Sequence, residues 1–399
     1  MHAVPLQATA FDRFAPSEEH RMLRQTVRGF VEREVEPQVL EHERAERFNL
    51  ALFRRAGALG LLGLTVPESY GGSGLDATAA VIASEELSAS DPGFALSWIA
   101  HSILFVHNLC VNASEAQRAR LLEPAVRGEK IGGVCMSEPG GGTDVLGMRT
   151  QAVREGDTYR ITGRKMWITN GCVDDRELGD CFIVYAKTGG EISTFVVEKG
   201  MPGFALGQRI KDKTGMRSSP TAELVFEDCR VPAGNRLGEE GASKIHIMRN
   251  LEIERLTLAA MSVGMARRSL DIMNRYGEER IAFGEPINHF GQIQRHIAES
   301  YAEYMAARSL TYQLAENIEL ARPGHRMETD AAKLFAATMA KNVADRAMQV
   351  LGGYGYVAES TVERMWRAAK LIEIGGGTLE AHHKNITRDL ARHPEALRG

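Results

Sequence analysis

The spacing of hydrophobic residues divides the chain into three stretches. From residue 17 to about residue 130, apolar residues recur every three to four positions, a period typical of amphipathic helices. From residue 131 to about 226 they mostly alternate with polar residues, as in short strands separated by Gly, Pro and Asp. The helical period returns at about residue 241 and holds almost to the end. We therefore predict an α+β multidomain chain with an N-terminal helical domain (1–130), a middle small β-barrel or sandwich (131–240) and a C-terminal four-helix bundle (241–399).

Turn and cap signals add detail to this outline. The proline- and glycine-rich segment 65–76, TVPESYGGSGLD, predicts a loop. Ser114 and Gln117 form a capping-box signature, which predicts that a helix begins there. The other helices expected from the apolar period span residues 77–89, 94–109, 242–276, 290–320, 328–351 and 379–391, the last four of them building the bundle.

The composition of the 399 residues argues against several classes of protein. Charged residues make up 25% with a net charge of -4, and no basic run dominates, which argues against binding to nucleic acid. No uninterrupted apolar stretch reaches the roughly 18 residues of a membrane span. The segment 1–19 has neither the apolar core of a signal peptide nor the arginines of a transit peptide. We therefore expect a cytoplasmic protein, although a trimmed organellar protein would look the same.

The cysteines indicate free thiols. They are odd in number and scattered, with no CxxC pair and no histidine partner at the spacing of a metal site. A reducing compartment explains this pattern most simply, and we predict no metal ligands. The five residues are Cys110, Cys135, Cys172, Cys181 and Cys229.

The segment 131–171 carries the residues that a planar, polar-edged cofactor needs. An apolar run ends in Ser137, three glycines and Thr143, where the backbone could approach a ligand closely and two hydroxyls could bond to it. The strand that follows brings Trp167 near its end, as a flat surface for a ring. The alternative interpretation is an ordinary hairpin with a glycine turn. One face of that strand is expected to consist of Tyr159, Ile161, Gly163, Lys165 and Trp167.

Glu254 is a carboxylate on a helical face that should be buried. At positions three, four and seven apart it shares that face with Ile247, Leu258, Met261 and Met265. A buried carboxylate costs several kcal/mol unless it is paired, protonated or used. Two interpretations follow: a glutamate at the edge of the surface beside its neighbour in sequence, or a general base whose pKa is raised by apolar surroundings.

Two further glycine clusters interrupt the C-terminal helices. The first is QVLGGYGY at residues 349–356, at the end of a long helix. The second is EIGGGTLE at residues 373–380, before the last helix, with Thr378 as a possible N-cap. A helix N-terminus after glycines can hold an anionic group, but helix-stop turns use the same residues.

Seven of these segments together resemble the acyl-CoA dehydrogenase family. They lie in the family's order and spread over nearly the whole chain: PESYGG, SEPGGGTD, KMWITNG, VFEDCRVP, ERIAFGEPI, QVLGGYGY and AKLIEIGGGTLE. The resemblance implies a three-domain fold like the one predicted above. It also implies FAD as cofactor, an acyl-CoA substrate, an electron-transferring flavoprotein as oxidant and a homotetramer.

The resemblance also implies roles for individual residues. Positions that meet the flavin or flank its ring are Met136, Ser137, Thr143, Trp167, Ile168 and Thr169. Positions that meet the FAD pyrophosphate and adenine, or reach the FAD of a neighbouring subunit, are Arg280, Phe283, Gln349, Gly352 and Gly353. Thr378 and Glu380 match the turn around the cofactor. Residues expected to lie at or to hold the substrate are Thr143, Glu252, Arg255, Gly376 and Gly377, with Glu252 and Arg255 alternatively holding the helix.

The position of the catalytic base separates this chain from most of the family. Most members carry a glutamate two residues before the threonine of the last glycine turn, where this chain has Gly376. A minority, including the isovaleryl-CoA dehydrogenases, supplies the base from the long helix in a motif like LDLERL. The matching LEIERL here implies that Glu254 is the base. The missing side chains at Gly375 and Gly376 should leave room for a branched acyl chain.

The reaction implied is the α,β-dehydrogenation of a short or branched acyl-CoA, similar to isovaleryl-CoA, to the 2-enoyl-CoA. Glu254 would remove the α-proton, and the β-hydrogen would leave as hydride to N5 of the flavin. A same-fold enzyme on a longer, terpenoid or carrier-bound thioester, or a flavin oxidase or lyase, is a second hypothesis. A non-catalytic scaffold that binds FAD or acyl-CoA is a third.

Three departures from the family's pattern point to a divergent branch. Gly291 stands where a glutamine usually contacts FAD, and Ala368 replaces an acid before the last glycine turn. His382 and His383 follow that turn. Because neighbours on a helix diverge by about 100°, we expect exposed or core histidines there and no metal.

Overall fold

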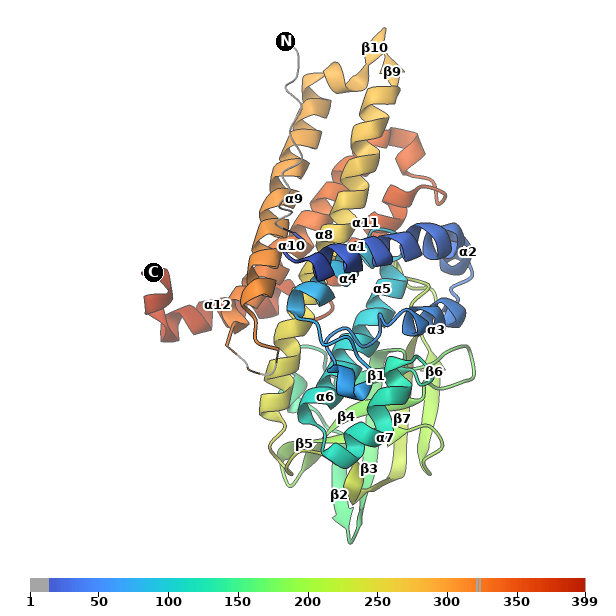
Figure 1. Ribbon diagram of the computed structural model, residues 1–399, viewed down its shortest axis with the longest axis vertical. Helices are drawn as coiled ribbons and strands as arrows, with labels where there is room; N and C mark the ends of the chain where they lie inside the picture. Colours follow the sequence, from blue (N-terminus) through green and yellow to red (C-terminus); the bar gives the residue numbers. More distant parts are fainter. Residues whose placement is uncertain (1–13, 321, 323, 399) are drawn as a thin grey trace.

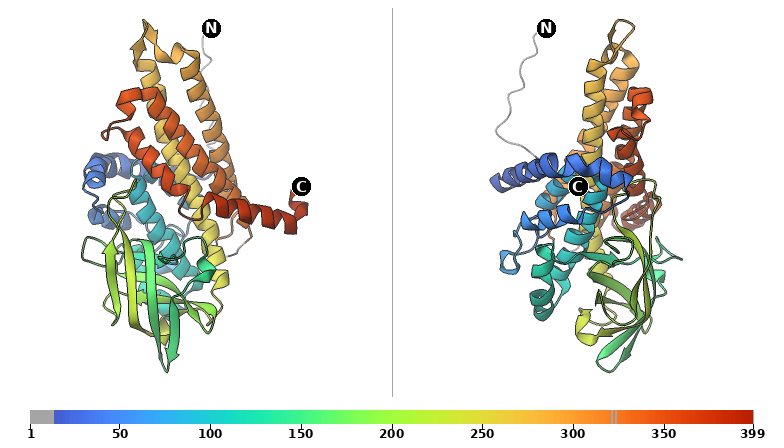
Figure 2. Two further views of the ribbon diagram at one scale, coloured as in Figure 1. Left: turned by 180° about the vertical axis from the view of Figure 1, so that it is seen from behind. Right: turned by 90° about the vertical axis from the view of Figure 1, so that its right-hand side faces the viewer.

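The computed structural model describes residues 14–320, 322 and 324–398 (Figure 1). Residues 1–13, which hold most of the segment used to predict the absence of a targeting peptide, lie outside this range. The long axis of the molecule runs from a β-rich end to the tip of a helical bundle, and the N-terminal helices pack beside the junction of the two (Figure 2).

The first part of the chain is helical, as the apolar period predicted. The predicted capping box is present: Ser114 accepts a hydrogen bond from the amide of Gln117, and the Gln117 side chain accepts one from the amide of Ser114. The predicted loop 65–76 contains a single 3₁₀ turn, Glu68–Tyr70. The helices are α1 (Glu18–Phe30), α2 (Val39–Arg44), α3 (Leu50–Ala58), α4 (Ala77–Ser88), α5 (Pro92–Trp98), α6 (Asn108–Asn112) and α7 (Glu115–Val126).

A π-helical segment, Ile99–His107, joins α5 to α6 without a break. The resulting helix Pro92–Asn112 has a mean hydropathy of 1.6 over its most apolar window, so by length and composition it could cross a membrane. The sequence analysis did not predict this. In the structure 78% of that window is buried inside the protein, as in the core helix of a globular domain.

The middle part of the chain forms one eight-stranded sheet. Its strands follow the order β6-β7-β3-β2-β4-β5-β8, and β1 pairs in parallel with β4. Two irregularities in the pairing of β3 with β7 fall at Ile161–Gly163 and Lys165–Ile168. The strands are β1 (Gly132–Cys135), β2 (Gln151–Glu155), β3 (Thr158–Thr169), β4 (Cys181–Thr188), β5 (Glu191–Glu198), β6 (Phe204–Arg209), β7 (Thr221–Pro232) and β8 (Arg236–Leu237).

The C-terminal part is a helical bundle, but its fourth helix is not the one predicted. The sequence analysis chose residues 379–391, and it passed over Thr361–Ile372, which packs in the bundle instead. The last α-helix projects sideways from the body, and a 3₁₀ turn, Pro394–Leu397, follows it (Figure 2). The elements are α8 (Lys244–Glu279), the hairpin β9 (Ile281–Ala282) and β10 (Glu285–Pro286), α9 (Gly291–Asn317), α10 (Arg326–Leu351), α11 (Thr361–Ile372) and α12 (Leu379–Arg392).

A buried cluster of charges joins α4 to the bundle. Glu85 and Glu86 are 0% and 2% exposed, and Arg267 on α8 donates to Glu86 at 2.7 and 2.9 Å. Arg308 on α9 pairs with Glu85 at 3.1 Å, and Tyr312 donates a hydrogen bond to the same carboxylate. Although burial alone would raise the pKa of Glu85, the surrounding guanidinium groups lower it. The cluster therefore keeps both carboxylates ionised inside the protein.

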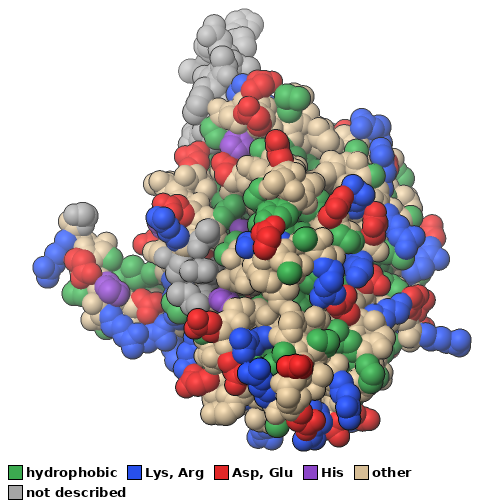
Figure 3. All heavy atoms as spheres, turned by 60° about the horizontal axis from the view of Figure 1, so that its bottom comes forward, with side chains coloured by type: hydrophobic (Ala, Val, Ile, Leu, Met, Phe, Trp, Pro, Cys, Tyr) green, Lys and Arg blue, Asp and Glu red, His purple; other side chains and the backbone are tan. Residues whose placement is uncertain are grey.

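The surface at the β-rich end is evenly mixed in charge. Acidic and basic side chains are interspersed over this face (Figure 3). A polyanion such as nucleic acid would need a basic stripe or patch, and this face offers none.

Candidate active site

Glu254 lies on the buried face of α8, as predicted. Its partners on that face, Ile247, Leu258 and Met261, are no more than 4% exposed. The Glu254 side chain itself is half-buried, and within the described residues no group donates a hydrogen bond to its carboxylate. Burial raises the pKa of Glu254, and the charges of Arg255 and Lys333 oppose this only in part. An unpaired carboxylate with a raised pKa has the properties of a general base.

The glycine turn between α11 and α12 faces Glu254. A Cβ placed on Gly376 would lie 3.6 Å from Oε1 of Glu254, so the two positions meet in space although 122 residues separate them in sequence. The same Cβ would lie only 2.0 Å from Cδ1 of Leu258. Leu258 therefore takes part of the room that the glycines were expected to free. Gly375 contributes little here, since its Cβ direction meets Leu371 at ordinary contact distance.

The sheet closes the site from a third side. Tyr185 on β4 is fully buried, and Asn108 donates a hydrogen bond to its hydroxyl at 3.3 Å. Burial raises the pKa of Tyr185 to about 12, and the charge of Glu254 contributes to the rise. The site therefore lies where the N-terminal helices, the sheet and the bundle come together.

Glu252 and Arg255, the neighbours of Glu254 on α8, are engaged within the protein. The Glu252 carboxylate accepts hydrogen bonds from the amide of Gly324 at 3.1 and 3.2 Å, and burial raises its pKa. Arg255 is buried and pairs with Asp330 at 3.1 Å. These contacts favour the second of the two predicted roles, in which both residues hold the helix.

The glycine loop after β1 offers hydrogen-bonding groups that the protein itself does not use. Within the described part of the chain, no hydrogen bond engages the hydroxyls of Ser137, Thr143 or Thr169. Gly140 and Gly142 face open space, so a ligand could approach their backbone. Met136 is half-buried beside them. The loop also makes a tight turn, with Glu138 and Gly141 exchanging backbone hydrogen bonds at 3.0 Å.

Glu138 holds this loop, and the sequence analysis missed it. Its carboxylate accepts hydrogen bonds from the Thr150 hydroxyl at 2.6 Å, the Arg149 amide at 2.7 Å and the Lys165 ammonium at 3.0 Å. Burial favours the neutral acid, but these donors prevail and lower the pKa of Glu138 to about 2. Lys165 is 0% exposed on β3, on the same buried face as Tyr159 and Ile161.

Trp167 does not share that face. The strand alternates as predicted through Lys165, but an irregularity follows, and Trp167 takes a φ of 64° and stands 61% exposed. Ile168 turns into the core instead, at 3% exposure. A bulge of this kind re-aims a side chain, and here it presents the indole to solvent next to the free hydroxyl of Thr169.

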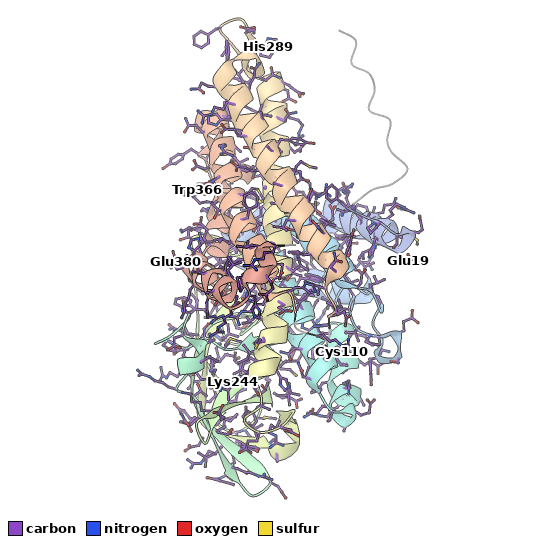
Figure 4. The ribbon with its side chains drawn as sticks, turned by 90° about the vertical axis from the view of Figure 1, so that its left-hand side faces the viewer. Glu19, Cys110, Lys244, His289, Trp366 and Glu380 are labelled. Carbon is purple, nitrogen blue, oxygen red and sulfur yellow. The ribbon has the colours of Figure 1, made fainter. Side chains whose placement is uncertain are left out.

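A second group of predicted cofactor residues gathers at the far tip of the bundle. Arg280, Phe283, Gly352 and Gly353 line one pocket of about 670 Å³, and Phe283 is 98% exposed. Gln349 is exposed at the end of α10, just before this pocket. Figure 4 shows His289 at this tip, whereas Glu380 lies on α12, nearer the junction with the sheet. One chain therefore does not bring the two groups of predicted cofactor residues together.

Comparison with known proteins agrees with this geometry. Residues 17–129 match the model of the acyl-CoA dehydrogenase N-terminal domain, residues 133–229 that of the middle domain and residues 245–391 that of the C-terminal domain. The chain belongs to the acyl-CoA dehydrogenase family. It is therefore an oxidoreductase, with the three-domain fold that the hydrophobic pattern predicted.

Relatives of this acyl-CoA dehydrogenase act on different acyl groups. It is 41% identical over 383 residues to the mitochondrial isovaleryl-CoA dehydrogenase of Pongo abelii, covering 93% of this chain and 88% of that one. The butyryl-CoA dehydrogenase of Megasphaera elsdenii superposes with a TM-score of 0.88 at 34% identity, over 94% and 98% of the two chains. A glutaryl-CoA dehydrogenase of Mycobacterium smegmatis, solved with FADH2, gives 0.88 at 29% identity, over 94% and 95%.

The sequence analysis missed Asp330 and Lys333, two residues of α10 behind the glycine turn of this acyl-CoA dehydrogenase. Both are 0% exposed, as is His382 on α12, which the sequence analysis named without a role in the site. His382 is thus a core histidine, one of the two predicted possibilities. Within the described residues, no group of three or more His, Cys, Asp or Glu side chains could hold a metal ion. The available signal was the pair of charges three apart on the alanine-rich face of α10.

The glycine turn itself is capped as predicted. Thr378 accepts a hydrogen bond from the amide of Ala381 at 3.1 Å at the start of α12. Glu380 is exposed in the first turn of that helix, where its negative charge is favourable. Gly376 and Gly377 have φ values of 64° and 91°, a backbone conformation that favours glycine.

Proposed function

We propose that this acyl-CoA dehydrogenase oxidises a short, branched acyl-CoA, similar to isovaleryl-CoA, with Glu254 as the catalytic base. The observation that carries the proposal is the 3.6 Å separation between Oε1 of Glu254 and the Cβ direction of Gly376. A carboxylate from α8 thus reaches the place that a side chain at position 376 would occupy. The identity to isovaleryl-CoA dehydrogenase over most of both chains supports the choice of substrate.

The residues of the site divide the chemistry as follows. Glu254, ionised, takes a proton from the α-carbon of the thioester and becomes a carboxylic acid, while the α,β double bond forms. FAD, when bound, supplies the oxidation by accepting the β-hydrogen with its electron pair. Leu258 and Tyr185 exclude water around the carboxylate, which keeps its pKa raised and its basicity high. The product is a 2-enoyl-CoA.

The residues that would hold FAD lie in the two groups described above. Met136, Ser137, Thr143 and Thr169 would contact the flavin through backbone and hydroxyl groups, beside Trp167 and Ile168. The free hydroxyls and the open glycines of the loop fit this role. Arg280, Phe283, Gln349, Gly352 and Gly353 would contact FAD bound by a neighbouring subunit. This division supports an assembly of more than one chain, and we propose the homotetramer that the family resemblance implies. Thr378 and Glu380 complete the turn around the cofactor.

The electron acceptor and the compartment follow from the family resemblance and the composition. We propose an electron-transferring flavoprotein as acceptor and the cytoplasm as the location. The exposed indole of Trp167 is a surface at which such a partner could approach the flavin.

One experiment tests this proposal first. The purified yellow protein is mixed anaerobically with stoichiometric isovaleryl-CoA, butyryl-CoA or glutaryl-CoA, and the flavin absorbance is followed. Fast bleaching with isovaleryl-CoA, together with an enoyl-CoA product, is the expected result. Faster bleaching with a straight or dicarboxylic chain would overturn the choice of substrate.

Other outcomes would support the alternatives. Flavin that stays oxidised with all three esters would favour a longer, terpenoid or carrier-bound thioester, or a scaffold without turnover. Rapid reoxidation of the reduced flavin by oxygen would favour an oxidase. A Glu254→Gln variant as active as the parent protein would contradict the assignment of the base.

A further inference from the structure

Lys333 places a charge inside the bundle behind the active site. Its side chain is 0% exposed on α10, and its ammonium donates a hydrogen bond to the carbonyl of Gly377 at 2.5 Å. This is its only hydrogen bond in the described part of the chain. Burial lowers the pKa of Lys333 to about 8, and the charge of Glu254 opposes the shift. Burying an ammonium group costs free energy of folding unless its contacts compensate. We therefore look for a function that explains why a lysine stands here.

His382 approaches the same carbonyl from α12. Its Nε2 lies 3.0 Å from the oxygen of Gly377, and its Nδ1 contacts the carboxylate of Asp330. Both ring nitrogens therefore face acceptors. Burial lowers the pKa of His382, so the neutral ring donates to one of them at a time and to both only when it is protonated. Asp330 in turn pairs with Arg255, the neighbour of the proposed base. Two helices thus hold one backbone oxygen of the glycine turn.

The turn has few other restraints at that point. Residues 375–377 are three consecutive glycines, the residue type with the greatest backbone freedom. The amide of Gly375 bonds back to Leu371, the amide of Leu379 donates to the carbonyl of Glu373 at 3.2 Å across the turn, and Thr378 caps α12, but within the described residues Gly376 makes no hydrogen bond. The bond from Lys333 to the Gly377 carbonyl is therefore the contact that ties the turn to α10.

We propose that Lys333 is a positioning residue for the proton abstraction: its ammonium holds the carbonyl of Gly377, and with it the glycine turn, against Glu254. The inference rests on the function proposed above. A turn held in this way keeps the α-carbon of a bound thioester within reach of the carboxylate. The same ammonium is a positive charge near Glu254 and favours its ionised form.

The titratable groups around this pair come from five elements. Glu254 is faced by Arg255 on its own helix, by Lys333 on α10 and by Tyr185 on β4. Lys333 is faced by Glu254, Arg255 and Asp330, by Glu373 directly after α11 and by His382 on α12. Removing Lys333 therefore takes away one of the two cations that oppose the effect of burial on Glu254.

The first test measures the turn directly and needs no substrate. Amide hydrogen exchange is followed by mass spectrometry in Lys333→Met and in the matched control Lys341→Met, which changes a partly exposed lysine on the same helix. We expect peptides that contain residues 374–379 to exchange about tenfold faster in Lys333→Met only, with α4 unchanged. Unchanged exchange in these peptides would overturn the proposal, whether or not the enzyme acts on isovaleryl-CoA.

The second test separates positioning from a general loss of structure. In Lys333→Met we expect kcat to fall by roughly tenfold or more with KM little changed, at equal flavin content. The acid limb of the pH profile should move to higher pH by about one unit, because Glu254 loses a nearby cation. Lys333→Arg should restore the position of that limb. A rise in KM alone, with an unmoved limb, would contradict the role.

A third variant keeps the proposal testable if Lys333→Met does not fold. His382→Phe keeps an aromatic ring at this position but removes the contacts of the imidazole to Asp330 and to the Gly377 carbonyl. It should also speed exchange in residues 374–379, since it removes the second contact to the same carbonyl. An exchange pattern like that of the parent protein would show that the His382 contact does not restrain the turn, which would contradict the hold on this carbonyl from two helices.

Discussion

Oε1 of Glu254 lies 3.6 Å from the point where a side chain on Gly376 would begin. The carboxylate of the long helix α8 therefore lies beside the glycine turn, where a side chain at position 376 would otherwise stand. In Glu254→Gln we expect kcat to fall by about 10²–10⁴-fold, the range for loss of a general base. Anaerobic bleaching of the flavin by the acyl-CoA measures the effect.

The same substitution should not destabilise the protein. Burial raises the pKa of Glu254 in the folded state, so ionised Glu254 opposes folding at pH 7, and this penalty fades as the pH falls below the unfolded-state pKa. Glu254→Gln should therefore melt at or above the parent temperature at pH 7, with a smaller difference at pH 4. A large drop in Tm would mean that the lost activity reflects misfolding.

Gly376 should tolerate no side chain. Its φ of 64° disfavours other residues, and a Cβ would overlap Cδ1 of Leu258 at 2.0 Å. We expect Gly376→Ala to lower the free energy of unfolding by about 1–3 kcal/mol, measured in urea. The control is Gly234→Ala, since a Cβ there meets nothing within 4 Å. Equal stability of the two variants would contradict this account of the turn.

Leu258 should set the room beside the α and β carbons of the substrate. Leu258→Ala removes the side chain that fills the space next to Gly376. We expect kcat/KM for acyl chains with bulk at these carbons to rise relative to butyryl-CoA by roughly tenfold. The cavity should also lower the free energy of unfolding by about 3 kcal/mol. Leu270→Ala, on the same helix but distant from the turn, should reproduce the loss of stability without the change in preference.

Glu138 should make the glycine loop sensitive to acid. Its folded-state pKa of about 2 is below the ordinary value of 4.5. Its stabilising effect is therefore fully present above pH 4.5 and is lost as the pH falls toward 2. Urea unfolding midpoints of the parent protein should drop between pH 5 and pH 3, and those of Glu138→Gln should start lower and drop less. The exposed Glu155→Gln variant should follow the parent curve.

The sequence predicted the features that depend on the spacing of apolar residues, and those that depend on a single polar residue at an apolar position. The three-domain fold followed from the apolar spacing, and Glu254 stood out because a carboxylate on an apolar face needs an explanation. Helix α11 was missed although Val362, Met365 and Ala369 repeat at helical spacing. It is short and lies between two glycine clusters, which drew the interpretation toward loops.

The rest of the site depends on contacts between distant segments. Lys333, Asp330 and His382 come together only when α10 packs against the start of α12, and no local pattern specifies that contact. The outward turn of Trp167 depends on a bulge, which the alternation of residues along β3 does not reveal. The role of Leu258 depends on its contact with the glycine turn, and the sequence around Leu258 shows only an ordinary core leucine.

The buried charges of α4 bear on how the chain assembles as it is made. Glu85 and Glu86 belong to the N-terminal part, but Arg267 follows Glu86 by 181 residues, and Arg308 and Tyr312 follow Glu85 by 223 and 227. While the chain leaves the ribosome, Arg24 and Arg28 of α1 are already available to pair with Glu86, but the three partners on α8 and α9 arrive only when those helices have been synthesised. The first domain in sequence therefore completes its buried charge cluster only after the first two long helices of the C-terminal part are in place.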